Sequence, residues 1–148
     1  MNIRIEVISP ENILQIIPLL QKINHKTPLD LLKERTLEMA GLPNYECIGL
    51  YDSFNLIGIT GLWYSTRHYI GRTVEVDHVI IDETYRSQGL GKQFLEWISA
   101  YTKSKGCEAV ELNTYSENRK SHKFYYNEGF EIYGFHFLKI MREDKEFY

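Results

Sequence analysis

The sequence predicts a single α/β (α+β) domain with a central mixed, mostly antiparallel sheet and about four flanking helices. Residues 3–7 alternate apolar and charged residues with the period of a half-buried strand, and residues 73–81 are a β-branched run with polar interruptions. Other segments repeat apolar residues with helical spacing, and two of these follow Ser-Pro or Thr-Pro starts. Residues 73–113 read as strand, loop, helix and strand, which is the order of a right-handed crossover between parallel strands.

The first forty residues predict a strand followed by a helical hairpin. Residues 3–7 alternate isoleucine or valine with charged residues, which indicates a short strand. Ser9 and Pro10 are a good helix start, and Pro18 within the helical pattern should kink or split that helix. A second start signal precedes a helix from Leu29 to about Met39.

The middle of the chain predicts a three-stranded meander that leads into the crossover. Its strands are expected at Tyr45 to Tyr51, Leu56 to Tyr64 and Thr73 to Ile81, and Ser65 to Arg72 should form the loop before the last of them. A helix from Lys92 to about Lys105 and a buried strand from Ala109 to Asn113 should follow. The remaining chain predicts a helix from Asn118 to Asn127 and a last strand from Phe130 to Met141.

Composition limits the classes of function. The 148 residues carry a net charge of −3, which argues against a nucleic-acid binder that works through a basic surface. No stretch reaches the ~20 apolar residues needed to cross a bilayer, and the N-terminus lacks the apolar core of a signal peptide. Cys47 and Cys107 show no metal or redox spacing. We therefore expect a soluble cytoplasmic protein with no metal, no nucleic-acid partner and no membrane partner.

A glycine-bearing turn, Arg86-Ser-Gln-Gly-Leu-Gly91, joins the central strand to the crossover helix. Such a turn exposes backbone N–H groups at the positive end of a helix, where a phosphate or diphosphate can bind. The turn is not a P-loop, because Arg86 stands where the first glycine would be and Gln93 where a serine or threonine would be. The dinucleotide pattern fails as well, since position 94 is phenylalanine. The alternative is an ordinary strand–helix turn.

Two blocks of the sequence resemble the GNAT N-acetyltransferase superfamily. Arg86, Gly89 and Gly91 resemble its acyl-coenzyme A diphosphate loop. A downstream block resembles its other signature, with matches at Asn118, Ser121, Phe124, Tyr125, Gly129 and Phe130. The resemblance covers about Thr73 to Met141. It implies a GNAT acyl-CoA N-acyltransferase fold with a splayed parallel strand pair, and transfer of an acyl group, usually acetyl, from acetyl-CoA to an amine.

The resemblance also implies the residues that hold the coenzyme. Backbone from the central strand would bind the pantetheine, and the loop amides would bind the diphosphate. Asn118 would touch the pantetheine or diphosphate arm, or serve as a helix N-cap, or both. Tyr125 would be the general acid that protonates the leaving thiolate; the alternative is a core tyrosine. The expected coenzyme contacts are Val79, Ile80, Ile81, Arg86, Ser87, Gln88, Gly89, Leu90, Gly91, Lys92, Asn113, Asn118, Phe124 and Tyr125.

The general base is left open by the sequence. Glu75 and Asp77 lie two apart on the central strand and share a face if no bulge intervenes. Each carboxylate could instead be solvated or salt-bridged. His78 would then lie on the opposite face, where a buried, hydrogen-bonded role is the stronger alternative. A water chain without a single base is a further alternative, and a β-bulge would change which residue faces the cleft.

The acceptor and the assembly also stay open. We expect direct attack by a primary amine of a small molecule or peptide on acetyl-CoA in a ternary complex, and the alternative is a non-catalytic acyl-CoA sensor. Many relatives carry two strands after the Gly-Phe of the second block, and this chain is too short for two long ones. The last strand could be single or be completed by another molecule, as in a homodimer.

Overall fold

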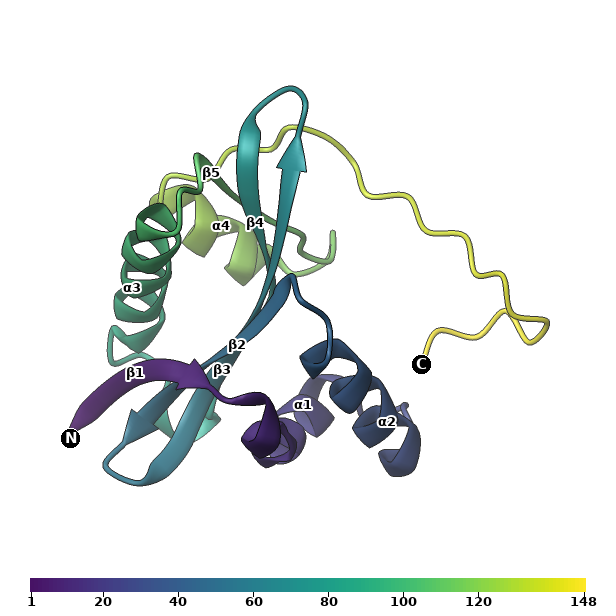
Figure 1. The fold of residues 1–148 in the computed structure, drawn as a ribbon, viewed down its shortest axis with the longest axis horizontal. Coiled ribbons are helices and arrows are strands. Elements are labelled where there is room, and N and C mark those ends of the chain that lie inside the picture. The colour runs from purple at the N-terminus through teal and green to yellow at the C-terminus, as the bar shows by residue number, and fades with distance from the viewer. The chain divides into compact units, whose positions relative to one another are not determined.

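The computed structural model describes residues 1–148 and contains one five-stranded sheet in the order β1-β2-β3-β4-β5 (Figure 1). Neighbouring strands are antiparallel except β4 and β5, which are parallel. This confirms the predicted mixed sheet. The strands are β1 (Ile3–Ile8), β2 (Tyr45–Asp52), β3 (Asn55–Arg67), β4 (Gly71–Ile81) and β5 (Ala109–Leu112). The helices are η1 (Pro10–Ile16), α1 (Ile17–Ile23), α2 (Leu29–Ala40), η2 (Glu83–Tyr85), α3 (Leu90–Ser104) and α4 (Arg119–Asn127).

The chain divides into two compact units, Met1–Leu112 and Asn113–Tyr148. The first unit holds the sheet with α1, α2 and α3, and the second holds α4 and the C-terminal segment. No helix has the length and apolar character that a membrane span requires.

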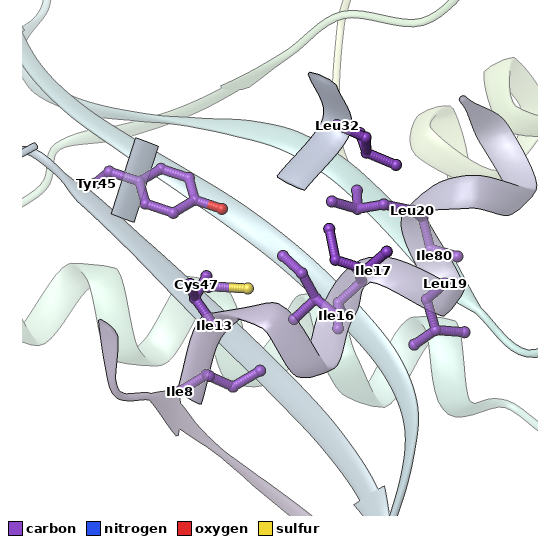
Figure 2. Packing of buried hydrophobic residues seen from close by; sticks show 11 residues of the cluster. Ile8, Ile13, Ile16, Ile17, Leu19, Leu20, Leu32, Tyr45, Cys47 and Ile80 are labelled. Atoms are coloured by element: carbon purple, nitrogen blue, oxygen red, sulfur yellow. The ribbon is translucent and has the colours of Figure 1, made fainter. Parts of the chain in front are cut away.

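Two helical layers cover opposite faces of the sheet in the first unit. Tyr45 and Cys47 of β2 pack with α1 and α2 in one apolar cluster, which Figure 2 shows in close-up. Between them in sequence, Glu46 accepts hydrogen bonds from the Tyr101 hydroxyl of α3 at 2.9 and 3.2 Å. Because successive residues of a strand point to opposite faces, α3 lies on the face away from α1 and α2.

Pro18 splits the first helical segment, as the sequence predicts. The chain runs as a 3-10 helix over Pro10–Ile16, and the α-helix starts at Ile17 with Pro18 in its first turn. A proline there loses no hydrogen bond, because the first N–H groups of a helix have no helical acceptor.

The β3–β4 hairpin is longer than predicted. β3 continues to Arg67 and β4 begins at Gly71, so the expected loop from Ser65 to Arg72 contracts to residues 68–70. Ser65, the first residue of that predicted loop, is instead the cross-strand partner of Thr73.

The predicted last strand from Phe130 to Met141 is wrong. The chain forms no helix or strand after α4, and the Tyr133 and Phe137 side chains are 94% and 90% exposed. Strand-forming apolar and aromatic residues are present, but a strand also needs a neighbour for its backbone N–H and C=O groups. The second unit contains no strand that could serve as that neighbour.

Candidate active site

A β-bulge in the centre of β4 shapes the candidate site. The pairing of β4 with β3 shifts register between Thr60 and Leu62, so that Gly61 alone stands opposite Asp77 and His78. The Thr60 hydroxyl donates a hydrogen bond to the His78 carbonyl oxygen. Thr60 is fully buried, so the bulge is held from within the sheet.

The bulge turns His78 toward the face covered by α1 and α2. An alanine-type Cβ built on Gly61 would lie 3.2 Å from His78 Nε2 and 3.1 Å from the Tyr45 hydroxyl oxygen, and Tyr45 belongs to the apolar cluster on that face. Glu75 points to the same face, because its cross-strand partner Trp63 packs against that cluster. The expectation that His78 faces away from Glu75 is therefore wrong, and the extra residue of the bulge is the reason.

His78 is half-buried, with its ring turned inward and its pKa below the ordinary value. Both ring nitrogens are buried without a hydrogen-bond partner of good geometry. Burial lowers the pKa of His78, and the charge of Asp77 and the backbone of Ile59 oppose that shift in part. Asp77 is exposed beside it. The bulge thus pairs an accessible carboxylate with a buried imidazole on consecutive residues.

Tyr45 faces the same bulge from β2. Its hydroxyl is buried and also lacks a hydrogen-bond partner of good geometry. Burial is the main cause that raises the pKa of Tyr45, with smaller contributions from Cys47 and Asp77. Burial likewise raises the pKa of Cys47 to about 12, so this thiol stays protonated at neutral pH and is no nucleophile there.

A second carboxylate stands beside Glu75. In the parallel ladder Glu75 lies opposite Glu111 of β5. Glu111 Oε2 accepts a hydrogen bond from the Thr73 hydroxyl at 2.7 Å. The same oxygen forms an ion pair with Arg67 Nε at 3.3 Å. That contact is the main cause that raises the pKa of Arg67. Sequence reasoning did not single out Glu111, because only the register of the parallel pair places it beside Glu75.

The parallel pairing stops halfway along β4. Its last pair is Val76 with Leu112, whereas β4 continues along β3 as far as Ile81. Beyond Val76 the edge of β4 that faces away from β3 is therefore not paired with β5. An open strand edge can bind an extended ligand through backbone hydrogen bonds, in the way that an added strand would. The Ile80 side chain is buried in the core, so only its backbone could take part.

The glycine turn ends at the start of α3, as predicted. Ser87 and Gly89 both have positive φ, at 61° and 76°. The first helical hydrogen bond runs from the Gln93 N–H to the Gly89 carbonyl at 3.1 Å. The N–H groups of the three preceding residues consequently have no acceptor within the helix. Of the predicted loop residues, Leu90 is buried and Gly91 is half-buried. The others are exposed: Arg86, Ser87, Gln88, Gly89 and Lys92.

The second unit carries the remaining predicted residues on and next to α4. The Asn118 side chain caps the helix, because its Oδ1 accepts a hydrogen bond from the Ser121 N–H at 3.2 Å. The Tyr125 ring lies 5.3 Å from the Phe124 ring and 5.6 Å from the Phe130 ring, centroid to centroid. Burial raises the pKa of Tyr125, so its phenol keeps its proton at neutral pH. Asn113 is the exposed first residue of this unit.

Comparison with known proteins gives one family. A model of the acetyltransferase (GNAT) family matches residues 14–130. Among curated proteins, the aminoalkylphosphonate N-acetyltransferase of Salmonella typhimurium is 30% identical over 74 residues, which are 50% of this chain and 48% of that protein. The match therefore spans about half the length of that relative.

Solved structures share the fold over nearly the whole chain. The aminoglycoside N-acetyltransferase AAC(6')-Iy in complex with CoA has a TM-score of 0.82 at 16% identity and covers 95% of both chains. The ribosomal-protein-alanine N-acetyltransferase of Brucella melitensis biovar Abortus 2308 has a TM-score of 0.79 at 16% identity and covers 95% of this chain and 100% of that one. At such identities the likeness shows the fold alone.

Proposed function

The chain belongs to the acetyltransferase (GNAT) family, and from that premise we propose that it transfers an acetyl group from acetyl-CoA to a primary amine. The observation that carries this proposal is the open edge of β4 leading into the α3 N-terminus. Pantetheine is an extended amide chain and diphosphate is an anion, so one segment offers a matching partner to each in the right order.

The residues around the glycine turn suit the diphosphate. The N–H groups of Leu90, Gly91 and Lys92 lie at the positive end of a 15-residue helix, and Arg86 and Lys92 are exposed cations beside it. Val79, Ile80 and Ile81 would bind the pantetheine through their backbone. When bound, acetyl-CoA supplies the activated thioester.

The chemistry needs one proton removed and one supplied. An acceptor amine is protonated at neutral pH, and we assign its deprotonation to Glu75 or Asp77, either directly or through water. The amine nitrogen then attacks the thioester carbonyl carbon, the carbon–sulfur bond breaks, and the sulfur leaves with the bonding pair. Tyr125 is assigned as the donor of the proton that the thiolate takes. After the reaction the carboxylate releases to solvent the proton that it took from the amine. The Tyr125 phenolate takes a proton from solvent and becomes a phenol again.

The charge of the β4–β5 surface supports a small cationic amine as acceptor. Three carboxylates, Glu75 and Asp77 of β4 and Glu111 of β5, lie on this pair of strands, and Arg67 forms an ion pair with Glu111. The relatives point the same way, since the names of two of them specify an aminoalkylphosphonate and an aminoglycoside. A peptide amine, as the name of the ribosomal-protein-alanine N-acetyltransferase specifies, is the alternative acceptor.

The experiment is a release assay for free thiol. Purified protein is incubated with acetyl-CoA and a panel of diamines, aminoglycosides, aminoalkylphosphonates and peptide N-termini. We expect turnover with at least one cationic small amine. Tyr125→Phe should lower kcat by about 10²-fold or more while the Kd for acetyl-CoA stays near the wild-type value. Tight coenzyme binding without turnover on any amine would favour a non-catalytic acyl-CoA sensor instead.

A further inference from the structure

Asp82 occupies the junction between β4 and the glycine turn. Its backbone N–H donates to the Ile57 carbonyl of β3 at 2.7 Å, which extends the sheet pairing by one residue past Ile81. The sheet thus fixes the position of Asp82, and residues 83–89 after it form η2 and the glycine turn.

The two carboxylate oxygens of Asp82 have different partners. Oδ1 accepts hydrogen bonds from the N–H of Thr84 at 3.0 Å and from its hydroxyl at 2.7 Å, which caps the short helix η2. Oδ2 accepts from Lys22 Nζ of α1 at 2.9 Å. The hydrogen bond from Lys22 is the largest cause that lowers the pKa of Asp82 well below its ordinary value, and Thr84 adds to it.

The contacts continue into the turn itself. Gln88 Nε2 donates a hydrogen bond to the Thr84 carbonyl at 3.4 Å. Thr84 is therefore contacted both by Asp82 and by Gln88, which lies in the glycine turn. A second contact ties the same segment to β2, because the Tyr85 hydroxyl donates to Asp52 Oδ2 at 3.0 Å. A series of contacts therefore runs from Lys22 of α1 through Asp82 and Thr84 to Gln88, two residues before the first N–H group assigned to the diphosphate.

We propose that Lys22 and Asp82 act as a positioning pair for the coenzyme loop, in which Lys22 both neutralises the Asp82 carboxylate and holds the cap that shapes the turn. The inference rests on the proposed binding of acetyl-CoA at that turn. It connects the helical hairpin to coenzyme affinity, although Lys22 is 64 residues before Arg86 in the sequence.

Stability alone does not account for the pair. The side chains of Lys22 and Asp82 are 42% and 28% exposed, and ion pairs of that exposure contribute little to folding. Their charges matter more for a bound anion. A carboxylate at the start of a diphosphate-binding turn opposes the ligand, and the same carboxylate paired with an ammonium group does not.

The test is calorimetric titration of the full chain with acetyl-CoA at low salt. Lys22→Met should weaken binding by about threefold to fivefold, the size expected for one uncompensated charge near a helix N-terminus. Lys22→Arg should retain wild-type affinity. Removing the carboxylate as well, in Lys22→Met with Asp82→Asn, should recover at least half of the lost affinity, because the unpaired charge is then gone. The KM for the amine should not change in Lys22→Met.

Lys26→Met is the matched control. It makes the same change of charge on an exposed lysine of the α1–α2 turn that forms no ion pair in the structure, and it should bind acetyl-CoA like wild type. Equal affinities of the Lys22→Met and Lys26→Met proteins would overturn the proposal, as would a double variant no better than Lys22→Met. Failure of the wild-type protein to bind acetyl-CoA would instead contradict the proposed function.

Discussion

The Tyr45 hydroxyl and His78 Nε2 approach the same point above Gly61, at 3.1 and 3.2 Å from where a Cβ on that residue would stand. They come from β2 and β4, and the glycine of β3 between them leaves room for both. A buried polar atom without a partner costs about 1–3 kcal/mol, so folded proteins contain few of them. Three such atoms, the Tyr45 hydroxyl oxygen and the two ring nitrogens of His78, therefore lie together at the bulge.

Gly61→Ala should disturb the bulge. The new methyl would meet Tyr45 and His78 at distances of 3.0 to 3.2 Å, which forces their side chains to shift. We expect a loss of about 1–3 kcal/mol in the free energy of unfolding, measured with denaturant, together with reduced acetyl transfer. Gly134→Ala is the control, because nothing lies within 4 Å of its added methyl. Equal stability of the two variants would contradict the crowding described at the bulge.

His78 should make the stability of the fold depend on pH. Its pKa in the folded protein lies below the ordinary value of 6.5, so the unfolded chain binds the proton more readily. The contribution of His78 is therefore fully present above pH 6.5 and is lost as the pH falls below that value. Unfolding free energies measured between pH 7.5 and 5.5 should fall less steeply for His78→Phe than for wild type. Parallel curves would show that His78 titrates normally in the fold.

Gly89→Ala should weaken coenzyme binding by straining the turn. Gly89 has a φ of 76°, where an L-residue costs about 1–2 kcal/mol, although no atom would crowd the methyl. Gly106→Ala at the other end of α3 is a matched control, with a φ of 84° and a similarly open site. Both variants should lose stability in thermal unfolding, but only Gly89→Ala should raise the Kd for acetyl-CoA. An equal effect of both on the Kd would place the diphosphate elsewhere.

Glu46→Ala should loosen α3 from the sheet. The carboxylate accepts hydrogen bonds from Tyr64 at 2.7 Å and Tyr101 at 2.9 Å, and its removal leaves two partly buried phenols without that acceptor. We expect a loss of about 1–3 kcal/mol in the free energy of unfolding. Glu34→Ala on the exposed side of α2 should change it by less than about 0.5 kcal/mol. A Glu46→Ala protein as stable as wild type would show that α3 is held by apolar packing alone.

The local order of residues was sufficient to predict most helices and strands and the glycine turn before α3. Alternation predicted the first strand and a β-branched run predicted the fourth. Pro18 predicted the break before α1, and the order of residues alone placed the glycine turn at the start of α3. These features depend on the conformational preferences of neighbouring residues, which a sequence displays directly. Apolar and aromatic residues also predicted a strand at Phe130 to Met141 that does not form, because strand pairing needs a partner as well as suitable residues.

The sequence by itself determined the family, the order of elements as far as α4 and the glycine turn before α3, since each depends on residues close together in the chain. Only the tertiary structure decided that His78 faces the same side as Glu75, that Glu111 stands beside Glu75, and that Lys22 pairs with Asp82. These relationships depend on cross-strand register and on helix placement. One extra residue in a strand reverses which face its side chains occupy, and nothing local in the sequence records where that residue is accommodated.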